Sequence, residues 1–184
     1  MATTFGPSAL ATPANAISLV RILLLPVQVA LILADAGWAA LALWVVLSVS
    51  DLADGWLARR QGATRSGAYL DSLADKFLIL GAMAALVAEG VMWWVPVAII
   101  AVREGLMSAY RSYVGRRGVS VPARLPGKVK MWFQAIVVGL AIAPVEGELY
   151  RGFWVAVLWA AVVLTVVTGA QYALDARRVS RDFP

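Results

Sequence analysis

Residues 51–75 read D-L-A-D-G-W-L-A-R-R-Q-G-A-T-R-S-G-A-Y-L-D-S-L-A-D, and the rest of the chain is best interpreted from this stretch. It contains two pairs of aspartates, Asp51 with Asp54 and Asp71 with Asp75, spaced three and four residues apart. Residues at these spacings lie on one face of an α-helix, so each pair predicts a helix with two carboxylates on one side. Small residues share these faces and leave room between the two helices: Gly55 and Ala58 on the first, Gly67 on the second.

The four carboxylates need a physical reason to face one another. Like charges repel, and an acidic residue at the centre of a membrane helix costs about 2.5–3.5 kcal/mol. Hard divalent cations, which bind oxygen ligands, neutralise such a cluster. A solvated acidic loop is the alternative, but the helical spacing and the small residues on the same faces favour a cation site.

The composition indicates a membrane protein. The chain has 184 residues, of which 61% are hydrophobic, and we expect a single all-α membrane domain over residues 1–184. It contains no histidine and no cysteine, which excludes imidazole bases, thiol nucleophiles and disulfides, so that a general base must be a carboxylate, a lysine or a tyrosine. The net charge of +5 would suggest nucleic acid in a soluble protein. In a membrane protein it favours contact with anionic lipids, and we expect no nucleic acid partner.

The apolar stretches predict a bundle of six transmembrane helices. Residues 1–13 are small and polar and are expected to lie loose or at the membrane interface. One long helix over residues 77–102 is the alternative to separate third and fourth spans, but Glu89 and Gly90 interrupt it, and Trp93 and Trp94 mark an interface. The spans are expected at residues 17–34, 38–60, 67–88, 91 to beyond 103, 129–143 and 153–173, with a loop at 115–127.

Charge predicts the orientation of this bundle. With six spans, the basic loops at residues 59–65, 116–124 and 177–181 all fall on one side. Basic loops favour the cytoplasm, so we expect an inner-membrane protein whose termini, motif and polar cavity face the cytoplasm. A cleaved signal peptide is the alternative, since Ala34, Asp35 and Ala36 resemble a cleavage site, but no lysine or arginine precedes Arg21.

A second group of polar residues lies in the fourth predicted span. Glu104, Ser108 and Arg111 are spaced to share one helix face, with Arg103 beside it. This arrangement predicts a pocket for an anion. The alternative is that Arg103 and Glu104 form an ion pair that only neutralises itself.

Further basic residues stand near the starts of apolar stretches. Lys128 and Lys130 open the fifth span, and Arg21 follows Asn15 in the first. On spacing alone, these long side chains could equally reach the lipid headgroups.

The motif as a whole resembles the signature of the CDP-alcohol phosphotransferase family, D-x2-D-G-x2-A-R-x7-G-x3-D-x3-D, and every fixed position is present. The resemblance implies that two divalent ions, Mg²⁺ or Mn²⁺, are bound by the motif aspartates, and that Asp75 is also the catalytic base. The implied metal ligands are Asp51, Asp54, Asp71 and Asp75. The implied contacts to a CDP-linked donor are Asn15, Asp54, Gly55, Ala58, Arg59 and Gly67.

Three other segments resemble the phosphatidylglycerophosphate synthase branch of that family: N-A-I-S-L-V-R-I-L-L-L-P at 15–26, V-R-E-G-L-M-S-A-Y-R at 102–111 and P-G-K-V-K at 126–130. They imply a homodimeric enzyme that transfers a phosphatidyl group from CDP-diacylglycerol to glycerol 3-phosphate. The residues implied to bind the acceptor phosphate are Arg21, Arg103, Ser108, Arg111, Lys128 and Lys130.

Alternatives to this function exist within and outside the family. With the same chemistry, the acceptor could be inositol phosphate, or phosphatidylglycerol in cardiolipin synthesis, and the basic residues weaken the second of these options. A cation channel or transporter could instead use the acidic residues. Small residues and Arg59 beside the carboxylates fit a nucleotide better than a pore.

Overall fold

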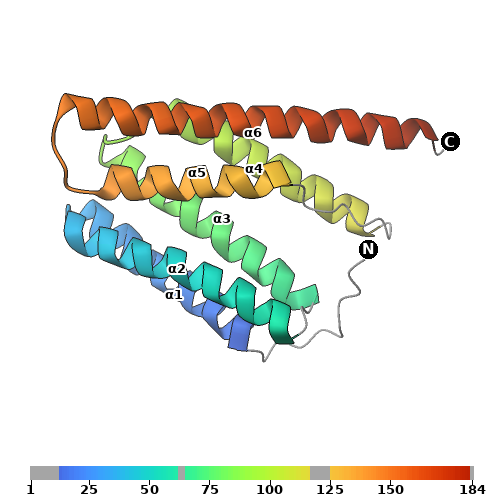
Figure 1. The fold of residues 1–184 in the computed structure, drawn as a ribbon, viewed down its shortest axis with the longest axis horizontal. Coiled ribbons are helices and arrows are strands. Elements are labelled where there is room, and N and C mark those ends of the chain that lie inside the picture. The colour runs from blue at the N-terminus through green and yellow to red at the C-terminus, as the bar shows by residue number, and fades with distance from the viewer. Residues whose placement is uncertain (1–12, 62–64, 117–124, 183–184) are drawn as a thin grey trace. The chain divides into compact units, whose positions relative to one another are not determined.

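The computed structural model describes residues 13–61, 65–116 and 125–182, and it gives side-chain surroundings for residues 16–51, 71–110 and 129–171. Over these ranges its regular structure is entirely α-helical, as Figure 1 shows. The helices there are α1 (Pro13–Leu33), α2 (Gly37–Gln61), α3 (Arg65–Ala88), α4 (Trp94–Arg116), α5 (Leu125–Ile142) and α6 (Glu148–Asp182). The predicted all-α class with six helices is confirmed for the described part of the chain.

Two turns contain residues with left-handed backbone conformation. Asp35, between α1 and α2, has a φ of 52°, and Gly90, between α3 and α4, has a φ of 71°. Glycine adopts a positive φ without steric cost, and aspartate tolerates it better than most residues with a Cβ. Glu89 and Gly90 therefore separate the third and fourth helices as predicted, and one continuous helix over residues 77–102 is excluded.

Several helices extend beyond the predicted spans. α1 begins at Pro13, α5 begins at Leu125, and α6 begins at Glu148 and continues to residue 182. The predicted ends were wrong because they followed the apolar residues, whereas a helix can continue through polar residues outside an apolar stretch. Glu148 in the first turn of α6 also suits the positive end of the helix dipole.

α4 begins later than predicted. It starts at Trp94, whereas the prediction placed its start at residue 91. The amides of Val91 and Met92 both donate to the carbonyl of Leu86, at 3.0 and 3.1 Å, and so belong to the turn that closes α3. This capping arrangement delays the start of the next helix.

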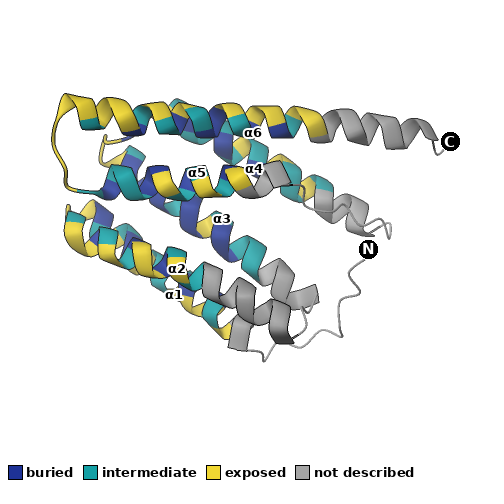
Figure 2. Cartoon of the chain, in the orientation of Figure 1, coloured by how far each residue is buried: buried dark blue, intermediate teal, exposed yellow. Residues whose placement is uncertain are grey.

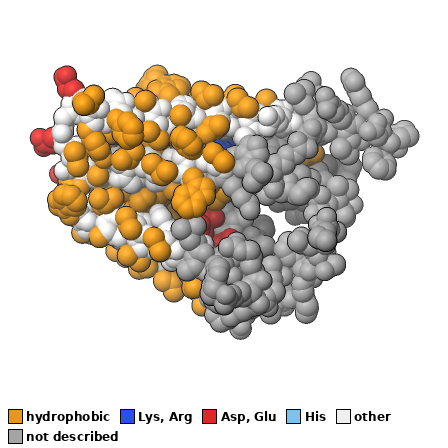
Figure 3. Space-filling view, in the orientation of Figure 1, with side chains coloured by type: hydrophobic (Ala, Val, Ile, Leu, Met, Phe, Trp, Pro, Cys, Tyr) orange, Lys and Arg blue, Asp and Glu red, His pale blue; other side chains and the backbone are white. Residues whose placement is uncertain are grey.

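Among the described residues, two helices are long and apolar enough to cross a membrane: Ala16–Leu33 within α1 and Glu148–Gln171 within α6. Gly37–Asp51 and Val129–Ile142 are shorter apolar stretches. Figure 2 shows exposed positions along the described helices. Many of these exposed side chains are hydrophobic, and hydrophobic side chains cover much of the described part of the face drawn in Figure 3. Such a surface suits contact with lipid. The cytoplasmic cavity and the full set of six spans stay predictions.

The described residues form two compact units, and each is considered by itself. The first contains α1, α2 and α3, together with Val138–Pro144 at and beyond the end of α5. Within it, α1 packs against both α2 and α3. An added Cβ at Gly81 of α3 would lie 2.9 Å from Cδ1 of Leu25 on α1, so glycine permits a close approach of these helices. That contact lies one turn beyond Arg21.

The second unit contains α4, α6 and most of α5. α4 packs against α6. Near the start of α4, the rings of Trp93 and Trp159 lie 6.3 Å apart between centroids. This packing places the polar residues of α4 beside those of α6.

Candidate functional site

The first unit brings three motif aspartates together in a group that we call the carboxylate cluster: Asp51, Asp71 and Asp75. One carboxylate oxygen of each lies within 4.8 Å of the others. Asp51 comes from α2, whereas Asp71 and Asp75 lie one turn apart on α3. The side chain of Asp54, the fourth predicted ligand, lies outside the described residues. The helical spacing in the sequence and the packing of α1 against α2 and α3 together produce this cluster.

Arg21 of α1 lies inside the carboxylate cluster. Its Nη1 donates to Asp51 Oδ1 at 2.7 Å and to Asp75 Oδ1 at 2.6 Å, and its Nη2 donates to Asp71 Oδ1 at 2.7 Å. The arginine side chain is only 1% exposed. The sequence assigned Arg21 to an acceptor phosphate, and the structure places its guanidinium against the aspartates.

The cluster runs from a partly open side to a buried one. The side chains of Asp51 and Asp71 are 35% and 40% exposed, whereas that of Asp75 is 11% exposed. Asp75 is thus the most buried of the three described carboxylates. Solvent reaches the first two more easily, so a charged ligand would approach from their side.

The donor set of the cluster fits a divalent cation. Three carboxylates and one guanidinium leave a formal charge of minus two, the charge that one divalent ion balances. Carboxylate oxygens are the ligands that Mg²⁺ and similar hard ions prefer. An ion held by these oxygens competes for them with Arg21, because the guanidinium already contacts all three residues.

The second unit contains another buried group of charges, which we call the polar layer: Arg103 and Glu104 of α4, Lys130 of α5 and Thr168 of α6. Glu104 Oε1 accepts from Arg103 Nη1 at 3.1 Å and from Lys130 Nζ. Arg103 Nη2 donates to Thr168 Oγ1 at 2.9 Å. Two cations therefore share one carboxylate, and the layer keeps one net positive charge. The Arg103–Glu104 pair exists, but it does not neutralise the layer.

Ser108 lies one turn after Glu104 on the same helix face, as the sequence predicts. Its hydroxyl donates to the backbone carbonyl of Glu104 at 2.8 Å. The side chains of the remaining predicted site residues lie outside the part of the chain that the structure describes: Asn15, Gly55, Ala58, Arg59, Gly67, Arg111 and Lys128.

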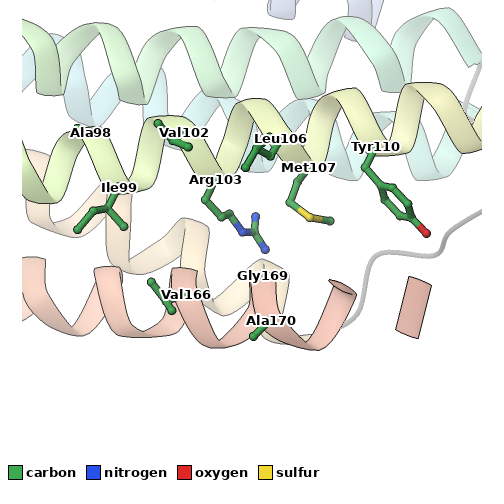
Figure 4. Close-up of a pocket in the computed structure, with 10 residues that line it drawn as sticks. All are labelled: Ala98, Ile99, Val102, Arg103, Leu106, Met107, Tyr110, Val166, Gly169 and Ala170. Atoms are coloured by element: carbon green, nitrogen blue, oxygen red, sulfur yellow. The ribbon is translucent and has the colours of Figure 1, made fainter. Parts of the chain in front are cut away.

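A mostly apolar groove of about 720 Å³ lies between α4 and α6 beside the polar layer. Figure 4 shows Arg103 extending from α4 toward Gly169 of α6, among apolar side chains such as Val102, Leu106 and Val166. A guanidinium in such a setting has little water near it, so its electrostatic interactions are strong.

Sequence reasoning missed three buried polar residues of α5 and α6: Gln134, Thr165 and Thr168. Gln134 Nε2 donates to Thr165 Oγ1 at 3.3 Å, and Thr168 contacts Arg103. All three missed residues are buried. Their signal was visible, because Thr165 and Thr168 are three apart in an otherwise apolar helix and Gln134 follows Lys130 by four residues.

Comparisons with known proteins give a consistent result. A family model described as CDP-alcohol phosphatidyltransferase matches residues 11–167. A probable phosphatidylglycerophosphate synthase of Mycobacterium tuberculosis (strain ATCC 25618 / H37Rv) is 38% identical, over 94% of this chain and 85% of the relative. The CDP-diacylglycerol–glycerol-3-phosphate 3-phosphatidyltransferases of Escherichia coli (strain K12) and Bacillus subtilis (strain 168) are 35% and 33% identical. These two matches cover 88% and 86% of this chain, and 92% and 91% of the relatives.

Proposed function

The chain belongs to the CDP-alcohol phosphatidyltransferase family, and from this premise we propose that it transfers a phosphatidyl group from CDP-diacylglycerol to glycerol 3-phosphate. The products are phosphatidylglycerophosphate and CMP. The observation that carries the proposal is the convergence of Asp51, Asp71 and Asp75, which the family motif contains. Relatives that match over most of their length are named for this reaction.

The proposed ligands of two divalent ions, Mg²⁺ or Mn²⁺, are Asp51, Asp54, Asp71 and Asp75. The negative charge of the carboxylate cluster and its oxygen donors support this assignment. When bound, the ions neutralise the donor pyrophosphate and the charge that develops as CMP departs. The residues proposed to hold the CDP part of the donor are Asn15, Asp54, Gly55, Ala58, Arg59 and Gly67.

Asp75 is the proposed base. It takes the proton of the acceptor hydroxyl, whose oxygen then bonds to the phosphorus that carries diacylglycerol. The bond from that phosphorus to the CMP oxygen breaks. Two observations support Asp75 for this role: it is the most buried described member of the cluster, and the chain contains no histidine or cysteine that could serve instead.

The acceptor phosphate is proposed to be bound mainly by basic residues of α4 and α5. The net positive charge of the polar layer supports an anionic ligand there. A phosphate also accepts several charge-assisted hydrogen bonds at once. The full proposed set is Arg21, Arg103, Ser108, Arg111, Lys128 and Lys130.

The setting proposed for this chemistry is a single domain of six membrane spans in the inner membrane. Its cavity and both termini face the cytoplasm, because the basic loops favour that side. The acyl chains of the donor lie in the bilayer, and its head enters the cavity. The working form is proposed to be a homodimer.

The direct test is CMP release from CDP-diacylglycerol by the purified protein with different acceptors. We expect release with glycerol 3-phosphate, and much less with inositol phosphate or phosphatidylglycerol. Release that depends on either of these acceptors, with none from glycerol 3-phosphate, would contradict the proposed acceptor but keep the family chemistry. The matched control is the same mixture without acceptor, which measures hydrolysis of the donor.

Acceptor binding gives a second prediction. Arg111→Ala or Lys128→Ala should raise the KM for glycerol 3-phosphate by about 10- to 100-fold, because a charge-assisted hydrogen bond contributes roughly 1.5–3 kcal/mol. The KM for CDP-diacylglycerol should change far less. Arg151→Ala is the control, since Arg151 is exposed in the first turn of α6. Equal changes in both KM values would place Arg111 and Lys128 outside the acceptor site.

A further inference from the structure

Arg103 is held from two sides within the polar layer. Glu104 accepts from its Nη1, and Thr168 accepts from its Nη2 at 2.9 Å. The Thr168 hydroxyl donates to the backbone carbonyl of Leu164 at 2.7 Å, within its own helix. Because a guanidinium can only donate, the Thr168 oxygen is the acceptor of the Arg103–Thr168 bond, and its own proton goes to the backbone carbonyl.

α6 also shapes the space around the Arg103 side chain. A Cβ added at Gly169 would lie 3.4 Å from Arg103 Cγ and 3.5 Å from its Nε. The Arg103 side chain therefore passes close to the backbone of Gly169, which has no side chain (Figure 4). Its Nη2 then reaches the hydroxyl of Thr168. Its Nε is buried and has no hydrogen-bond partner among the described residues.

Without Thr168, a different pairing would be favourable. Arginine and glutamate form strong bidentate pairs with two parallel hydrogen bonds. Arg103 and Glu104 share a single hydrogen bond through Nη1, and Nη2 of Arg103 donates to Thr168. The threonine therefore keeps Arg103 from pairing fully with Glu104 and leaves its other N–H groups available to an anion.

We propose that Thr168 is a positioning residue that holds the Arg103 guanidinium in the orientation that binds the phosphate of the acceptor. This inference rests on the proposed function, because it assigns Arg103 to that phosphate. It adds α6 to the acceptor site, although α6 carries none of the basic residues assigned to it. Thr168 itself touches no substrate in this account and acts through Arg103.

The test replaces Thr168 with valine, which has nearly the same shape but no hydroxyl. We expect the KM for glycerol 3-phosphate to rise about 5- to 20-fold, because a misoriented arginine loses part of its charge-assisted bonding. The KM for CDP-diacylglycerol should stay within about 2-fold. Thr168→Ser, which keeps the hydroxyl, should restore most of the lost affinity.

Thr165→Val is the matched control. Thr165 is as buried as Thr168, lies one turn away on α6 and bonds to Gln134 rather than to Arg103. Loss of its hydroxyl should therefore cost similar stability without changing the KM for glycerol 3-phosphate. An equal rise in KM for Thr165→Val, or no rise for Thr168→Val, would overturn the inference.

A second pair of variants covers the case in which Thr168→Val does not fold. Thr168→Ala also removes the hydroxyl that accepts from Arg103 but adds no bulk, so it should raise the same KM, whereas Thr165→Ala removes only the hydroxyl that bonds to Gln134. If Thr168→Ala and Thr165→Ala have the same KM for glycerol 3-phosphate, the inference fails. If the wild-type protein releases no CMP with glycerol 3-phosphate, the proposed function fails instead, so the two failures are distinct.

Discussion

Asp75→Asn should lower kcat by about 10²- to 10⁴-fold, the usual effect of removing a general base. Asparagine has the size of aspartate, and its side-chain oxygen can still accept the hydrogen bond that Arg21 donates to Asp75. It cannot take a proton at neutral pH. Steady-state CMP release at saturating concentrations of both substrates measures this loss.

Binding of CDP-diacylglycerol separates the role of a base from that of a ligand. Asp75→Asn should weaken binding only slightly, because Asp51 and Asp71 remain in the cluster. Asp51→Asn, on the more open side, should instead weaken metal and donor binding together. Equally severe loss of donor binding in both variants would make Asp75 a ligand first, and the proton acceptor would then be a water molecule.

Removal of divalent ions should abolish turnover completely. Chelation by EDTA leaves the carboxylate cluster with its formal charge of minus two, which repels the pyrophosphate of the donor. Adding Mg²⁺ or Mn²⁺ in excess to the same sample should restore the rate, which controls for irreversible damage. A second readout is thermal unfolding, where ions that bind the folded state should raise the Tm. Undiminished CMP release in EDTA would contradict the metal assignment.

The fold class and the cluster could be predicted because their signals are local. Asp71 and Asp75 are four residues apart, so helical geometry alone places them on one face. Glu89 and Gly90 likewise predict a helix break from their own chemistry, and the backbone at Gly90 has the positive φ that glycine favours. Helix ends were less predictable, since hydropathy marks where a membrane stretch stops and not where hydrogen bonding stops.

Partners that are far apart in sequence could not be predicted. Arg21 and Asp71 are separated by 50 positions, and Arg103 and Thr168 by 65. No periodicity connects such residues, because their contact depends on how α1 packs on α3 and how α4 packs on α6. The sequence therefore identified Arg21 as a basic residue of interest but gave no sign of the carboxylates that it contacts.

The ion pairs of Arg21 also bear on how the protein is made. Arg21 lies in the N-terminal half of the apolar stretch Ala16–Leu33, and an unpaired arginine inside such a stretch is costly to place in a membrane. Its counter-charges, Asp51, Asp71 and Asp75, are synthesised later, on α2 and α3. Neither the cation nor the anions are compensated until these helices meet. The final position of α1 therefore depends on α2 and α3, which supply the carboxylates that pair with Arg21.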